Sequence, residues 1–126
     1  MTGAQHSRYR EIEVLTLSPG QRVVLLYSHL LATMRHARRV FATDIPVRAR
    51  KLQRCREVVF ELCASLDREA GGSLASNLMS IYAYALTQLT DLEVRRDAAR
   101  LDHLIELFES LHRAWQQVVT QAVAEV

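Results

Sequence analysis

Apolar residues recur at helical spacing in four separate stretches of the 126-residue chain. In the first stretch, gaps of four and three residues place the apolar side chains on one face of a helix. Ser18-Pro19-Gly20-Gln21 can begin this helix, because it combines a serine cap, a proline at the first helical position and a capping-box glutamine. The apolar stripe consists of Val23, Tyr27, Leu30, Met34, Ala37 and Phe41.

Three further stripes follow, separated by short breakers. Asp44 or Thr43 can cap the second helix, and Gly71-Gly72 is expected to end it. Ser73 and Asp97 can cap the third and fourth helices. The stripes are Leu52, Cys55, Val59, Leu62 and Leu66 in the second helix, Leu74, Leu78, Ile81, Ala85, Leu89 and Leu92 in the third, and Leu101, Leu104, Ile105, Phe108, Leu111, Trp115, Val118 and Val119 in the fourth.

Short connections between these stretches determine the expected fold. Links of about three to five residues force consecutive helices to lie antiparallel. The chain is therefore predicted to be all-α, with an antiparallel up-down-up-down four-helix bundle over residues 18–126. Residues 1–17 form an N-terminal arm with several apolar side chains, and we expect this arm to dock on the bundle. Permanent docking and displacement by a partner are both open at this point.

The apolar arcs of the first and third helices are wider than a bundle requires. Val24 and Leu31 lie to one side of the first stripe, and Met79, Tyr82 and Leu86 lie to one side of the third. Bundle geometry alone can explain a wide arc in one helix. Several wide arcs together indicate surface grooves that a partner covers.

Charge adds a second pattern to the apolar one. The net charge is +2, but residues 1–60 carry +7 and residues 61–126 carry −5. The chain has few glycines and prolines, which argues against an all-β fold and against disorder. The split predicts either a basic binding surface or two halves that face each other. The arginine cluster at residues 35–56 thus supports an alternative function, a helical module that binds nucleic acid or an acidic partner. A solvated, partly ion-paired face is the simpler interpretation, because no aromatic residues interleave with the arginines.

Other chemistry is sparse. Cys55 and Cys63 would lie about 12 Å apart on one helix, too far for a disulfide, so we expect reduced core residues. Glu109 and His112 match half of a di-iron motif without the second copy that such a site needs. No residues are arranged as a nucleophile with its base, so we expect no enzyme activity, metal or cofactor. Residues 70–90 are uncharged yet too polar for a membrane span, and the N-terminus lacks a signal-peptide core, which favours a soluble intracellular protein.

An ordered set of short motifs resembles the flagellar export chaperones of the FliS family over residues 9–117. The motifs are Tyr9-Arg10-Glu11, Ser18-Pro19-Gly20, Leu25-Leu26-Tyr27, Leu66-Asp67, Gly71-Gly72, Ala75-Ser76-Asn77-Leu78, Tyr82-Ala83-Tyr84, Asp97 and Ala114-Trp115. The chain departs from the family pattern at Ser28-His29, Ser73, Ala83 and Ala85, so a divergent or second copy of the family is one interpretation.

The resemblance implies a cytoplasmic chaperone that binds the disordered C-terminal segment of flagellin in apolar grooves and prevents premature polymerisation. The flagellar export gate and a second copy of the chain are further candidate partners, whereas nucleic acid and membrane insertion are not expected. The family's N-terminal arm would occupy part of the groove surface in the free protein. Motif positions suggest Tyr9, Tyr27, Asn77 and Tyr82 as partner-binding residues, and the wide arcs and the arm add Ile12, Val24, Leu31, Met79 and Leu86. Asn77 can instead act as a cap near the helix start.

Overall fold

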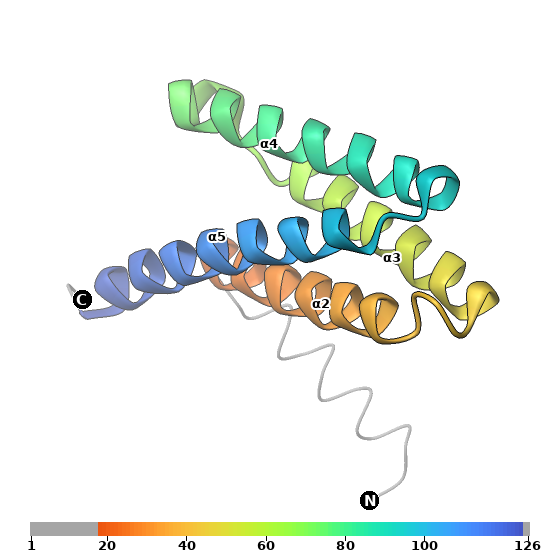
Figure 1. The fold of residues 1–126 in the computed structure, drawn as a ribbon. Helices are drawn as coiled ribbons and strands as arrows, with labels where there is room; N and C mark the ends of the chain where they lie inside the picture. The colour runs from red at the N-terminus through yellow and green to blue at the C-terminus, as the bar shows by residue number, and fades with distance from the viewer. Residues whose placement is uncertain (1–17, 125–126) are drawn as a thin grey trace, which may run out of the picture.

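The computed structural model describes residues 18–124, and those residues fold into four helices joined by short turns (Figure 1). No strand occurs within this described part of the chain. The predicted N-terminal arm, residues 1–17, lies outside the described residues. The helices are α2 (Pro19–Arg39), α3 (Ile45–Ala64), α4 (Arg68–Arg95) and α5 (Ala98–Ala124).

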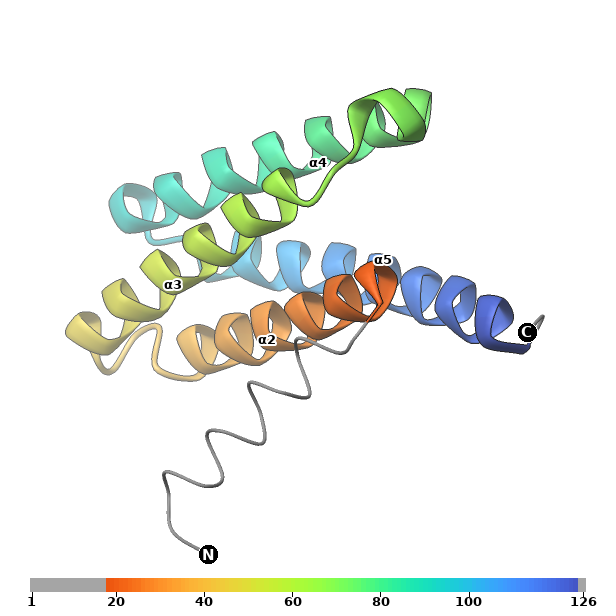
Figure 2. The same ribbon diagram turned by 180° about the vertical axis from the view of Figure 1, so that it is seen from behind.

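The four helices form a closed ring of antiparallel neighbours. Helix α2 packs against α3 and α5, and α4 packs against the same two helices from the other side. Seen from either side, each helix runs opposite to the one before it (Figures 1 and 2). The structure confirms the predicted up-down-up-down four-helix bundle.

Side-chain caps start three of the helices where the sequence predicts them. Ser18 Oγ accepts from Gln21 N–H at 3.2 Å while Gln21 Oε1 accepts from Ser18 N–H at 2.9 Å, which completes the capping box. The Asp44 carboxylate accepts from Val47 N–H at 3.2 Å, so Asp44 rather than Thr43 caps α3. The Asp97 carboxylate accepts from the N–H of Ala99 at 3.1 Å, at the start of α5.

The break between the second and third helices lies earlier than predicted. Helix α3 ends at Ala64, where Ser65 donates its hydroxyl to the Leu62 carbonyl at 2.7 Å. Gly71-Gly72 and Ser73 therefore fall within the span of α4, so Ser73 does not precede its first residue, but two helical pieces do meet at the non-helical Gly72. Gly72 has φ 53° and ψ −128°, a conformation that is essentially restricted to glycine, and it kinks α4 after its first turn. The glycine pair bends a helix that Asp67 has already started by accepting from Glu69 N–H.

The core is built from the predicted stripes of all four helices. Leu30, Leu52, Leu89 and Leu101 are completely buried, one from each helix. Two stripe positions are corrections, because Leu74 is 61% exposed and Val118 is 56% exposed. These two residues lie near the start of α4 and the end of α5, where helices extend past the part of the core that their neighbours cover. No described helix is long and apolar enough to cross a bilayer.

Candidate functional site

An apolar groove opens at the end of the bundle where α2 begins and α3 ends. Its volume is about 280 Å³, enough for a few side chains of a partner. All four helices or their turns contribute to its walls. The lining residues are Val23 from α2, Ser65, Leu66 and Asp67 after α3, Gly71, Leu74, Ala75, Leu78 and Tyr82 from α4, and Trp115 from α5.

The groove exists because α4 diverges from α5 towards this end. Figures 1 and 2 show the first half of α4 tilted away from the second half of α5. Helix α4 also packs less extensively against α5 than α2 does. The kink at Gly72 turns the first turn of α4 away from the rest of the helix, which places Gly71 in the groove wall. The side chains between the diverging helices are consequently left partly uncovered.

A buried pair of tyrosines forms the floor beneath the groove. The hydroxyl oxygens of Tyr27 and Tyr82 lie 2.6 Å apart, and both side chains are at most 1% exposed. The ring of Phe108 stacks on Tyr82, with centroids 6.3 Å apart. Burial raises the pKa of both hydroxyls; hydrogen bonds from Tyr82 and Trp115 partly oppose the shift for Tyr27. Both tyrosines are therefore neutral, and their pairing satisfies the two hydroxyl groups within the core.

The structure separates the predicted partner-binding residues into three groups. Tyr82 borders the groove but is only 1% exposed, and Tyr27 and Leu31 are buried in the core, so a partner could contact these three side chains extensively only after the helices separate. Half-buried or exposed positions outside the groove are Val24, Asn77, Met79 and Leu86. Tyr9 and Ile12 lie outside the described residues.

Several residues that line the groove were predicted from the sequence to be core residues. Val23, Leu78 and Trp115 belong to predicted core stripes, and Leu74 was predicted to be covered. The core prediction is confirmed for Leu78, which is 5% exposed, and Val23 and Trp115 pack against the core while they also line the groove. The motif Ala75-Ser76-Asn77-Leu78 lies beside the groove, and it was the available sequence signal for this wall.

Most arginines of the 35–56 cluster are engaged in ion pairs. Arg35 pairs with Glu109 at 3.1 Å and Arg38 pairs with Asp102 at 2.8 Å, which joins α2 to α5. Arg56 pairs with Glu93 at 3.1 Å, which joins α3 to α4. Each of these pairs links the basic half of the chain to the acidic half. The second interpretation of the charge split, two halves that face each other, is thus confirmed for these residues.

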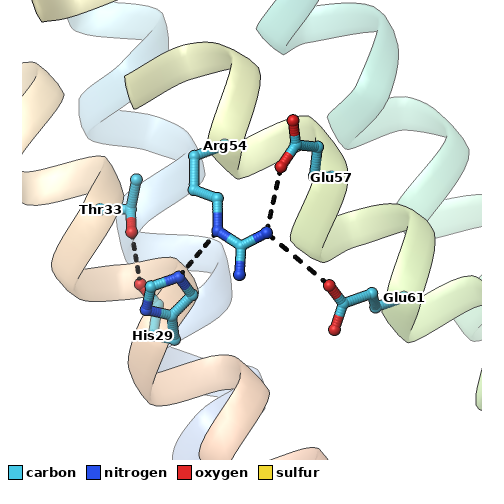
Figure 3. Close-up of polar contacts among 5 residues, drawn as sticks. All are labelled: His29, Thr33, Arg54, Glu57 and Glu61. Atoms are coloured by element: carbon cyan, nitrogen blue, oxygen red, sulfur yellow. Dashed lines mark hydrogen bonds and ion pairs between the residues drawn. The ribbon is translucent and has the colours of Figure 1, made fainter. Parts of the chain in front are cut away.

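Two other arginines of the cluster are held by different contacts. Arg54 on α3 donates to His29 Nε2 at 3.1 Å and pairs with Glu57 at 3.0 Å, with Glu61 at 3.8 Å (Figure 3). Arg48 is 6% exposed, donates to the Phe41 carbonyl at 2.7 Å and lies over the Phe41 ring at 4.8 Å. Neither guanidinium is free to bind a polyanion in this structure.

The candidate metal and thiol residues have structural roles. Glu109 pairs with Arg35, and His112 Nε2 lies 3.2 Å from the Ser28 hydroxyl. Among the described residues, no three His, Cys, Asp or Glu side chains gather as a metal site would require. Cys55 and Cys63 are reduced, as predicted, and burial raises the pKa of the Cys55 thiol to about 12.

Comparisons with known proteins place the chain among flagellar proteins. A family model described as flagellar protein FliS matches residues 1–122. The chain is 31% identical to the flagellar secretion chaperone FliS of Vibrio cholerae over 75 residues, which cover 60% of this chain and 55% of that relative. It is 27% identical to the flagellar secretion chaperone FliS of Salmonella typhimurium over 114 residues, which cover 89% and 84%. It is also 26% identical to the flagellar secretion chaperone FliSB of Pseudomonas aeruginosa over 109 residues, or 86% of each chain. With a family match that extends over nearly its whole length, the four-helix chain belongs to the FliS family.

Proposed function

We propose that this protein is a cytoplasmic export chaperone that binds the disordered C-terminal segment of flagellin and prevents premature polymerisation of flagellin. The apolar groove at the open end of the bundle is the observation that carries the proposal. Family membership and the names of the Vibrio and Salmonella relatives support the export-chaperone role. A chaperone of this kind needs a surface for apolar side chains and no reactive groups.

The groove suits an amphipathic segment that folds as it binds. Leu66, Leu74 and Trp115 offer apolar surface on three sides, and the hydroxyl-paired tyrosines keep the floor rigid. Each large apolar side chain that a partner buries contributes about 1.5–3 kcal/mol, which the cost of ordering the segment partly offsets. Held in this way, the flagellin segment would not be available for contacts with other flagellin molecules.

The N-terminal arm has a regulatory place in this proposal. Residues 1–17 would cover part of the groove surface in the free protein, and the cargo would displace them. Tyr9 and Ile12 would then contact the bundle only in the cargo-free state. A chain that lacks residues 1–17 is expected to bind the flagellin segment more tightly than the full chain does. An unchanged affinity would show that the arm does not compete with cargo.

A matched pair of surface substitutions tests the groove directly. Leu74 lines the groove and Phe60 lies outside it on α3, yet both are 61% exposed. Leu74→Ser is expected to weaken binding of a flagellin C-terminal peptide about tenfold in isothermal titration calorimetry, because it removes one apolar contact. Phe60→Ser should change the affinity by less than about twofold. Equal losses in both variants, or no loss in either, would contradict the assignment of the groove.

A further inference from the structure

The end of the bundle opposite to the groove carries four arginines without a carboxylate partner among residues 18–124. We call this surface the basic end and define it by Arg39, Arg50, Arg95 and Arg96, which are all exposed. The α2–α3 turn and the α4–α5 turn both lie at this end, at the right of Figure 1. None of the four arginines has a carboxylate partner within residues 18–124.

The arginines of the basic end differ from other arginines of the bundle, which form ion pairs between helices. Arg35, Arg38 and Arg56 are each matched to an acidic residue on a neighbouring helix. The carboxylates near the basic end in sequence have other partners: Asp44 caps α3, Asp97 caps α5 and pairs with Arg100, and Glu93 pairs with Arg56. Four of the arginines that lack a carboxylate partner among residues 18–124 are gathered at this end, where they create a local field for anionic groups, whereas Arg22 and Arg113 lie nearer the groove end.

Apolar side chains accompany the free arginines. Ile45 is 51% exposed at the start of α3, and Val94 is 81% exposed at the end of α4. Exposed aliphatic groups beside arginines are typical of protein interfaces, in which arginine is enriched. Nucleic-acid surfaces instead place aromatic rings among the arginines for base stacking. The exposed Phe60 lies farther along α3, away from this end, and the one exposed aromatic ring near it among residues 18–124 is Tyr84, which lines a shallow pocket with Asp97, Arg100 and His103.

We propose that the basic end docks an acidic protein segment that also carries apolar side chains. Glutamate and aspartate of the segment pair with the four arginines, while its apolar residues cover Ile45 and Val94. The surface lies at the other end of the helices from Val23 and Trp115 of the groove. A partner bound here leaves the groove open, so cargo and partner can occupy the protein together.

The test measures binding of a probe peptide to the full chain by fluorescence anisotropy. The probe is a labelled twelve-residue peptide of three Glu-Leu-Glu-Glu repeats, titrated at low salt and again near physiological salt. Arg39→Gln/Arg96→Gln is expected to weaken binding about fivefold, the effect of losing two exposed ion pairs. The control Arg22→Gln/Arg113→Gln removes the same net charge from exposed sites nearer the groove end and should change affinity by less than about twofold.

A second matched pair tests the apolar part of the surface. Ile45→Ser should weaken binding of the same peptide, whereas Leu25→Ser, at a 45% exposed position on α2, should not. Equal losses in the two arginine pairs would overturn the proposal, since binding would then follow net charge alone. Absence of peptide binding at low salt would also overturn it. Single-stranded DNA of the same charge that binds as tightly as the peptide would assign the surface to nucleic acid instead. None of these results depends on whether flagellin binds in the groove.

Discussion

The hydroxyl pair of Tyr27 and Tyr82 offers a quantitative test of the groove floor. Tyr82→Phe keeps the ring that stacks on Phe108 and removes only the hydroxyl, which leaves the Tyr27 hydroxyl without its 2.6 Å partner in a fully buried site. A stranded buried hydroxyl costs roughly 1–3 kcal/mol of unfolding free energy. In a chain of this size that corresponds to a decrease in melting temperature of about 4–10 °C. Tyr27→Phe is expected to cost a similar amount, because it leaves the Tyr82 hydroxyl without the same partner.

The double variant Tyr27→Phe/Tyr82→Phe separates pairing from packing. Since neither hydroxyl remains, the double variant should lose about as much as the worse single variant, with a coupling free energy of roughly 1–2 kcal/mol. Urea unfolding followed by circular dichroism at 222 nm measures all three variants against the parent chain. Losses that add within about 0.5 kcal/mol would refute the argument, because independent sites behave in that way.

Three further predictions concern the backbone, a histidine and the thiols. Gly72→Ala should lower the unfolding free energy by about 1–3 kcal/mol, because φ 53° with ψ −128° is strained for any residue with a Cβ; an unchanged melting temperature would contradict this. Burial and the Arg54 charge lower the pKa of His29. Protonation of His29 therefore favours the unfolded chain, so the free energy of unfolding is unaffected by this group above about pH 6.5 and decreases as the pH falls below that value. His29→Gln should therefore reduce the difference in melting temperature between pH 7.5 and pH 5, and an unaltered difference would refute the assignment. A thiol reagent should modify Cys63 well before Cys55, whose thiol is buried and has a pKa of about 12, and mass spectrometry of the digested protein would reveal the reverse order.

Local chemistry explains why the helix starts could be predicted. Ser18, Asp44 and Asp97 cap their helices through hydrogen bonds to backbone N–H groups two or three residues ahead. Such bonds involve neighbours in sequence, so the pattern of residue types is sufficient to locate them. The apolar stripes were equally predictable because helical periodicity determines which side chains share a face.

The glycine pair shows how the same reasoning can misplace a boundary. Gly71-Gly72 resembles a helix end, and Gly72 does adopt a positive φ. The helix nevertheless ends earlier, because Ser65 closes α3 through the Leu62 carbonyl and Asp67 begins the next turn. Both glycine roles need the same backbone freedom, so composition alone could not distinguish an end from a kink.

The groove depends on how the helices are arranged and could not be located from periodicity. Leu78 and Trp115 have the spacing of core residues and pack in or against the core, and the same two side chains also line the pocket between α4 and α5. The opposite net charges of the two halves of the chain predicted the ion pairs between helices, which the charge of one half alone could not do. Basic and acidic residues meet across helix seams in pairs such as Arg38 and Asp102, and four of the arginines left over mark the basic end.

Binding of flagellin with and without its C-terminal segment tests the central claim most directly. Isothermal titration calorimetry with the full protein would compare intact monomeric flagellin with a form that lacks the segment, and light scattering would follow filament assembly of the intact form. The proposed function predicts a one-to-one complex with intact flagellin, delayed filament assembly and no detectable binding once the segment is removed. Equal binding of both forms, or binding of neither, would contradict it.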